Sequence, residues 1–123
     1  MVGKYCYMID MYSELCVYDI EAQKLVHHRK LDLHGFTHYN ALAVAASPTL
    51  IGEHMVIMDN QGTALVLTLG AEPKVVHTNV IATQLDRHLP LPGQETLAYA
   101  PPIVSDDKIY LRGEKYLYCI GAK

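Results

Sequence analysis

The sequence predicts an all-β fold made of a repeated antiparallel unit. Half of the 123 residues are hydrophobic, which gives the chain enough apolar side chains for a folded core. Short runs rich in Tyr, Val, Ile and Leu alternate with turn residues, a pattern typical of half-buried strands. Three pairs of such runs recur at a similar spacing, which indicates an internal repeat.

Three hairpins are predicted in chain order. The first pairs "KYCYMID" with "LCVYDI" across a polar turn at residues 10–14. The second pairs "MVIMD" with "TALVLTL" across "NQG", where Gly62 can adopt the left-handed conformation that a hairpin turn needs. The third pairs "KIYLR" with "KYLYCI" across residues 113–114, Gly-Glu, which suit a two-residue turn. The best helix candidate, "THYNALAVAA", is followed at once by Pro48, which argues against a helix.

The hairpins align with one another as repeats. Tyr7 aligns with Ile57 and Val17 with Leu67, both at a spacing of 50, and Val56 aligns with Tyr110 at a spacing of 54. Further short apolar runs precede the second and third hairpins and follow the first and second. The predicted unit therefore has four strands, A to D. We predict a partial β-propeller of about two and a half four-stranded antiparallel blades, because this unit fits a propeller blade better than a sandwich.

The whole chain, 1–123, is predicted as a single all-β fragment. Residues 1–31 supply strands B-C-D of one blade, residues 41–81 a full blade, and residues 97–121 strands A-B-C of the last blade. The predicted order thus begins at B and ends at C. In a closed propeller the last blade often takes strand D from the far N-terminus, so we expect a natural C-terminus and a missing start.

Charge and cysteines exclude several classes of protein. The net charge of -3 gives no reason to expect a nucleic acid or an anionic membrane as partner. No run approaches the roughly 18 apolar residues of a membrane span, and the N-terminus lacks the pattern of a signal peptide. Cys6, Cys16 and Cys119 lack metal-type spacing, so we predict free thiols. A two-residue turn would pair Cys6 with Val17, and a three-residue turn would pair it with Cys16.

The segments "AASPTLIGEHMVIMDNQGTALVLTLG", "AYAPPIVSDDKIYLRGEKYLYCIG" and "VYDIEAQKLVHH" carry a resemblance to a known family. The chain resembles the C-terminal part of the β-propellers related to pyrroloquinoline-quinone (PQQ) dehydrogenases, the PQQ-like repeat family. Family blades pair a Ser-Pro strand A with a Val-Tyr strand B and a Leu-Tyr-x-Leu/Ile strand C. The resemblance covers nearly the whole chain, apart from residues 83–95. It implies a periplasmic or cell-envelope location for the full-length parent.

One departure from the family pattern affects the predicted function. The family's docking motif is Ala-x-Asp-x-x-x-Gly-x-x-x-Trp, whose Trp stacks between blades. Here Val17, Asp19, Gln23 and His27 occupy those positions, and the chain has no Trp. This resembles looser propellers that serve as scaffolds. We therefore expect a non-catalytic binding or scaffold module, with no cofactor. The alternative is a fragment of a PQQ-dependent quinoprotein dehydrogenase, which would need PQQ, calcium and a catalytic Asp.

Candidate binding residues come from the connections expected on one face of the blades. They are His34, His38, Tyr39, Arg87 and His88. Loops on a rigid scaffold are where binding residues concentrate. His34 and His38 have the His-x-x-x-His spacing that binds zinc on a helix, but a Gly-containing loop does not align them, so no metal site is predicted. The paired His27-His28 is expected in strand D, with one side chain facing a neighbouring blade and the other facing solvent. We predict no catalytic residue.

The predicted partners follow from the incomplete ring. Two interblade faces would be left bare, and the sequence offers Tyr5, Tyr7, Tyr116 and Tyr118 as side chains for them. Exposed apolar patches of this kind favour association. We therefore expect self-association or binding to missing N-terminal blades, with a further protein partner as an open possibility.

Overall fold

The computed structural model describes residues 1–33, 44, 46–60, 62–80, 100–112 and 117–121. These residues form ten strands and no helix. The first sheet contains β1 (Tyr5–Ile9), β2 (Glu14–Asp19) and β3 (Lys24–Lys30). The middle sheet contains β4 (Thr49–Ile51), β5 (His54–Met58), β6 (Thr63–Thr68) and β7 (Val75–Val80). The last sheet contains β8 (Ile103–Ser105), β9 (Lys108–Arg112) and β10 (Leu117–Gly121).

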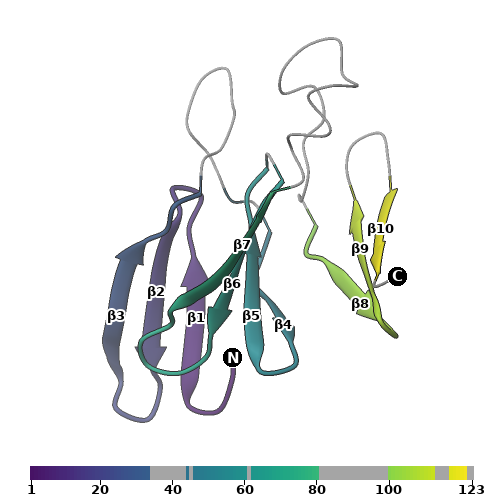
Figure 1. The fold of residues 1–123 in the computed structure, drawn as a ribbon. Helices are drawn as coiled ribbons and strands as arrows, with labels where there is room; N and C mark the ends of the chain where they lie inside the picture. Colours follow the sequence, from purple (N-terminus) through teal and green to yellow (C-terminus); the bar gives the residue numbers. More distant parts are fainter. Residues whose placement is uncertain (34–43, 45, 61, 81–99, 113–116, 122–123) are drawn as a thin grey trace.

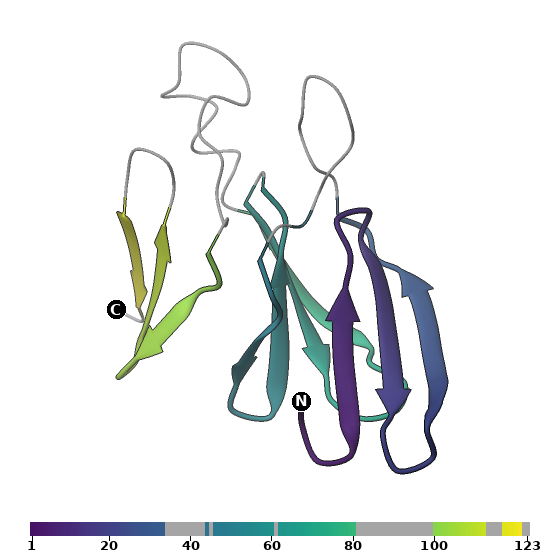
Figure 2. The same cartoon turned by 180° about the vertical axis from the view of Figure 1, so that it is seen from behind.

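All strand pairs are antiparallel, and each strand pairs only with its neighbours in the chain. Figure 1 shows the three sheets side by side, and Figure 2 shows them from behind. The all-β fold and the ten-strand order with three, four and three strands are confirmed. The sheets do not close into a ring.

The same short turn precedes β1, β5 and β9. Its first residue has a positive φ in each sheet: Gly3 (56°), Gly52 (58°) and Asp106 (53°). The residue pairs that flank this turn are also equivalent: Val2↔Tyr5, Ile51↔His54 and Ser105↔Lys108. Val2 therefore lies beside β1 as the last residues of β4 and β8 lie beside β5 and β9.

A β-bulge also recurs at one place in the repeat. The register between β2 and β3 shifts between Val17 and Tyr18, and the register between β6 and β7 shifts between Val66 and Leu67. The outer strand carries the extra residue in both sheets. Because a bulge bends a strand and increases its twist, we expect β3 and β7 to bend at equivalent positions.

The true repeat spacing in the first two sheets is 49, so the expected spacing of 50 was wrong. β1 and β5 begin at residues 5 and 54, and β2 and β6 begin at residues 14 and 63. The turns agree: Asp10 Oδ1 accepts a hydrogen bond from Glu14 N at 2.9 Å, and Asp59 Oδ1 accepts one from Thr63 N at 2.7 Å. Gly62 is left-handed, with φ 95°, as predicted.

Two predicted turns were also wrong. In the last hairpin Arg112 pairs with Leu117, whereas a two-residue turn at residues 113–114 would have paired it with Lys115; the turn itself lies outside the described residues. In the first hairpin Cys6 pairs with Tyr18, and Cys16 pairs with Met8, so neither expected partner of Cys6 is correct. The turn there contains Ser13 with φ 71°, which shifts the register of both strands. All three cysteines are free.

Two hydrophobic clusters lie between the sheets. The cluster between the first and middle sheets contains Leu15, Leu31, Leu33, Val44, Met55, Ile57, Leu65 and Leu67, with Tyr7, Ile9 and Leu69 packed against it. The cluster between the middle and last sheets contains Ala46, Met58, Ala64 and Leu111, with Val56, Ile109 and Tyr118 packed against it. Tyr7 and Tyr118 therefore pack inside the protein, so the expectation that they cover bare outer faces was wrong.

The two clusters use equivalent positions of the repeat. The first sheet contributes Tyr7, Ile9 and Leu15. The equivalent residues of the middle sheet, 49 residues later, are Val56, Met58 and Ala64. The middle sheet contributes Met55, Ile57 and Leu65 to the first cluster. The equivalent residues of the last sheet are Ile109, Leu111 and Tyr118, which follow them by 54, 54 and 53 residues. One mode of sheet packing is thus used twice along the chain.

Candidate interaction site

The five binding residues predicted from the sequence, His34, His38, Tyr39, Arg87 and His88, all lie outside the described residues. The site that the structure does describe is a cavity of about 520 Å³ between β1 and β4. Its lining consists of Met1, Val2, Tyr7, Met8, Ile9, Val44, Ala46, Ser47, Pro48, Leu50, Met55 and Leu69. This volume falls within the range of about 300–1,000 Å³ that is typical of ligand pockets.

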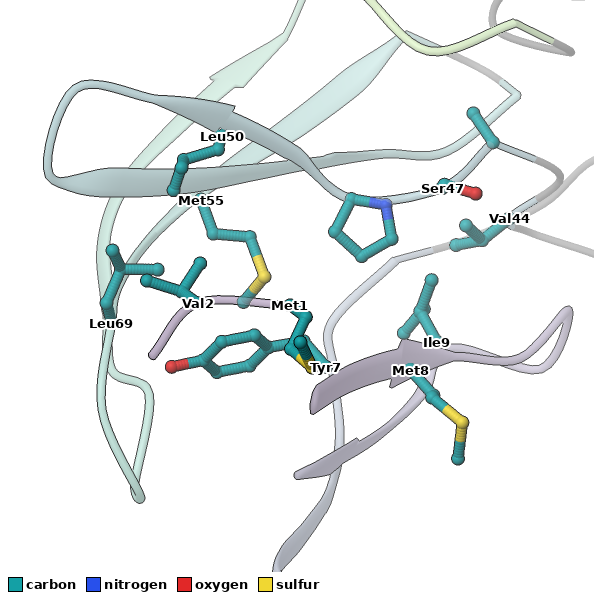
Figure 3. Close-up of a pocket in the computed structure, with 12 residues that line it drawn as sticks. Met1, Val2, Tyr7, Met8, Ile9, Val44, Ser47, Leu50, Met55 and Leu69 are labelled. Atoms are coloured by element: carbon teal, nitrogen blue, oxygen red, sulfur yellow. The ribbon is translucent and has the colours of Figure 1, made fainter. Parts of the chain in front are cut away.

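Most side chains that line the cavity are apolar, because strand alternation directs such side chains of β1 and β5 toward it. Tyr7 and Ile9 lie on the inner face of β1, and Met55 projects from the facing strand β5. Figure 3 shows the Tyr7 ring lying along the cavity, with Val2 and Met55 on one side of it. Among the described lining residues none is Asp, Glu, Lys, Arg or His. These side chains suit an uncharged occupant, since none of them could pair with a buried charge.

Tyr7 is fixed by two hydrogen bonds to the middle sheet. Its hydroxyl donates to Gly70 O at 3.0 Å and accepts from Gly70 N at 2.8 Å. Gly70 has φ 115°, a conformation that side-chain-bearing residues rarely adopt. The turn between β6 and β7 therefore presents both backbone groups to one hydroxyl, and the tyrosine ring is held in place against the cavity.

In the part of the chain that the structure describes, no strand pairs with the edge of β1 beside the cavity. Asp10 N donates to Glu14 O, so the alternation of an antiparallel ladder directs the N–H and C=O groups of Tyr7 and Ile9 away from β2. The equivalent residue in the middle sheet is Val56, which pairs with Thr49 of β4. Within the described residues, only Val2 pairs with this edge, through Tyr5. Among the described residues, this edge of β1 is therefore open at the position that β4 occupies beside β5 in the middle sheet.

An ion pair links the residue before β1 to the last residue of β2. Lys4 Nζ lies 2.9 Å from Asp19 Oδ2, and Asp19 Oδ1 accepts a hydrogen bond from Ala22 N at 2.9 Å. The Ala22 N–H, followed by Lys4, holds the pKa of Asp19 below its ordinary value. The hydrogen bond to Asp19 in turn raises the pKa of Lys4. Asp19 is the one residue that matches the family's docking motif outright, and here it organises the turn between β2 and β3.

The histidine pair in β3 lies as predicted. His27 is half-buried and pairs with Val17, whose side chain is fully buried. His28 is exposed and pairs with Cys16, and its Nε2 lies 2.9 Å from Glu14 Oε2. His27 thus contributes to packing, and His28 to a surface contact with Glu14. Among the described residues no cluster of three or more His, Cys, Asp and Glu is arranged to hold a metal ion.

The cavity residues were missed because most of them are ordinary apolar residues of strands and of the segments that connect strands. A sequence signal was nevertheless present: residues 1–3 repeat the apolar-apolar-Gly pattern of residues 50–52, which ends strand β4. This likeness places the start of the chain beside β1. No helix in the described part of the chain is long and apolar enough to cross a membrane. No protein-family model matches the chain, and a search of curated proteins found no significant match.

Proposed function

We propose that the chain is a non-catalytic binding or scaffold module, and that its three sheets are blades of a β-propeller. The observation that carries the proposal is the repeated sheet packing, in which equivalent positions meet twice in succession. Repeat proteins in which each unit contacts only its neighbours commonly present surfaces for binding partners. The resemblance to PQQ-like repeat propellers supports the same function.

The cavity is the proposed binding place. Its occupant would be an extended, uncharged segment of a protein partner that adds to the edge of β1. The middle sheet provides the template, because β4 and the preceding Pro48 occupy the equivalent place beside β5. Strand addition to a sheet edge draws its affinity from main-chain hydrogen bonds and its specificity from side-chain pockets.

A peptide with the sequence of residues 44–49, VAASPT, capped at both ends, tests this function. By analogy with Thr49 and Val56, its Thr would pair with Tyr7. In a spectrum of methyl-labelled methionines we expect the signals of Met1, Met8 and Met55 to shift on titration, because these residues line the cavity. The Met11 signal is an internal control, since Met11 lies in the turn after β1.

Two matched peptides sharpen the test. N-methylation of the peptide Thr removes the N–H that would bond to β1, so the shifts should disappear. Replacing that Thr by Val keeps the backbone intact, so the shifts should remain. If both peptides behave alike, strand addition is wrong. A change in quinone absorbance on adding PQQ and calcium would instead favour a quinoprotein fragment.

A further inference from the structure

The first and last sheets each expose a face that the middle sheet buries. On β1 and β2, Tyr7, Ile9 and Leu15 face the middle sheet, so alternation directs the neighbouring side chains outward. We call this set the first outer face: Cys6, Met8, Cys16 and Tyr18. On β9 and β10, Ile109, Leu111 and Tyr118 face the middle sheet. The last outer face is accordingly Tyr110, Arg112, Leu117 and Cys119.

These two outer faces are complementary in terms of the repeat. The first outer face lies at the repeat positions that Met55, Ile57, Leu65 and Leu67 occupy in the middle sheet. Those four residues pack against the first sheet. Tyr110, Arg112 and Leu117 occupy the positions of Val56, Met58 and Ala64, which pack on the last sheet. The first outer face therefore corresponds to the side of a sheet that packs on the preceding sheet. The last outer face corresponds to the side that packs on the following sheet.

The outer faces are apolar enough to associate. Met8 is 48% exposed, Tyr18 39% and Leu117 70%, whereas the equivalent Ile57 and Leu67 of the middle sheet are at most 1% exposed. Charge also matches, because Arg112 lies on the last outer face and Glu14, which also contacts His28, lies on the same face of β2 as Cys16. The aliphatic stem of Arg112 can cover apolar surface while its charged group stays in water.

We infer that a second copy of this chain docks head to tail, with its last outer face on the first outer face of its neighbour. The contact would repeat the packing that the chain already uses twice. It is heterologous, because different surfaces meet, so it can propagate or close into a ring. The inference rests on the proposed scaffold function and names the partner of that scaffold. Of the residues on the two outer faces, Met8 alone also lines the cavity beside the β1 edge.

Two single variants and their mixture test the contact. Tyr18→Glu places a charge on the first outer face, and Leu117→Glu places one on the last outer face. Neither residue lines the cavity. In sedimentation at micromolar concentration we expect the unmodified protein to be oligomeric and each variant alone to be monomeric. The mixture should form a one-to-one dimer, because each variant keeps the face that the other lacks.

A matched control and a crosslink complete the test. Val80→Glu introduces the same charge at a residue that is 52% exposed on β7 and belongs to neither face, so the oligomer should persist. A short thiol-to-thiol crosslinker should join two copies through Cys119 and either Cys6 or Cys16, and Cys119→Ser should abolish the product. A mixture that stays monomeric, or crosslinking that persists in Cys119→Ser, would overturn the head-to-tail contact. Titrating monomeric Tyr18→Glu with the VAASPT peptide then reports on the cavity alone, so failure of one proposal is distinguishable from failure of the other.

Discussion

The hydroxyl of Tyr7 forms two hydrogen bonds with the backbone of Gly70, 63 residues along the chain. One bond donates to the carbonyl oxygen and the other accepts from the amide. The pair connects β1 of the first sheet to the turn after β6 of the middle sheet. It therefore adds a directional link to the apolar packing of that interface.

Tyr7→Phe should lower the free energy of unfolding by about 1–3 kcal/mol, because each hydrogen bond contributes about 0.5–1.5 kcal/mol. Urea denaturation measures the loss. Tyr12→Phe is the matched control, since Tyr12 is 55% exposed in the first turn and its change should stay within about 0.5 kcal/mol. Equal effects for the two variants would show that the Tyr7 hydroxyl does not stabilise the interface.

The stabilising effect of Asp19 should depend on pH. Its pKa is lowered in the folded protein by Ala22 N–H and Lys4, so its contribution is fully present above the ordinary carboxyl pKa of about 3.9. That contribution is lost as the pH falls through the lowered value. We therefore expect Asp19→Asn to reduce stability near neutral pH, with the difference from the unmodified protein shrinking below about pH 4. A pH series of denaturation curves checks this, with the exposed Glu72→Gln as control.

Gln23→Gly should stabilise the turn between β2 and β3. Gln23 has φ 51°, and the left-handed conformation costs a side-chain-bearing residue about 1–2 kcal/mol. The resemblance also expects Gly at this position. We predict a gain of up to about 1 kcal/mol in thermal or urea denaturation, since the added flexibility of the unfolded chain offsets part of the effect.

Ser13→Gly provides the contrast to this variant. Ser13 has φ 71°, but its hydroxyl donates to Leu33 O at 3.2 Å, and the residue is buried. The lost hydrogen bond should cancel the conformational gain, so Ser13→Gly should be neutral or destabilising. A larger gain for Ser13→Gly than for Gln23→Gly would contradict this account.

Leu67→Ala should be strongly destabilising. Leu67 is fully buried between the first and middle sheets, and such truncations cost about 2–5 kcal/mol. Leu50→Ala is the control of matched chemistry, because Leu50 is 52% exposed. Denaturation of the two variants should differ by more than about 1.5 kcal/mol. Similar losses would mean that the inner face of β6 is not part of the core in solution.

The strand order was predictable from the sequence because every strand pairs with its chain neighbour, so each hairpin is visible as two adjacent runs. The repeat offset was not predictable to the residue. Strand β5 of the middle sheet packs on both faces, so Met55 and Ile57 on one face are as apolar as Val56 and Met58 on the other. A shift of one residue exchanges the faces of a strand, and an apolar strand gives no sign of the error.

The registers of the first and last hairpins were also predicted wrongly, and in the first hairpin the reason is different. The first turn depends on Ser13 in a left-handed conformation, which serine adopts only when its surroundings hold it. Its support comes from Leu31 N, which donates to Ser13 O, and from Leu33 O, which accepts from its hydroxyl. Those partners are about twenty residues away, so local turn chemistry does not reveal them. The cavity arises in the same way, from strands β1 and β4 that are remote in sequence.

The pairing of strands that are adjacent in the sequence affects the folding rate. Chains dominated by contacts between near neighbours fold faster than those that must close long loops first. Each sheet can form its hairpins without the others, and the sheets then need only to dock. We therefore expect amide hydrogen exchange to divide this small β-protein into three units of separate stability, with β5 and β6 of the middle sheet, which contribute to both hydrophobic clusters, exchanging last.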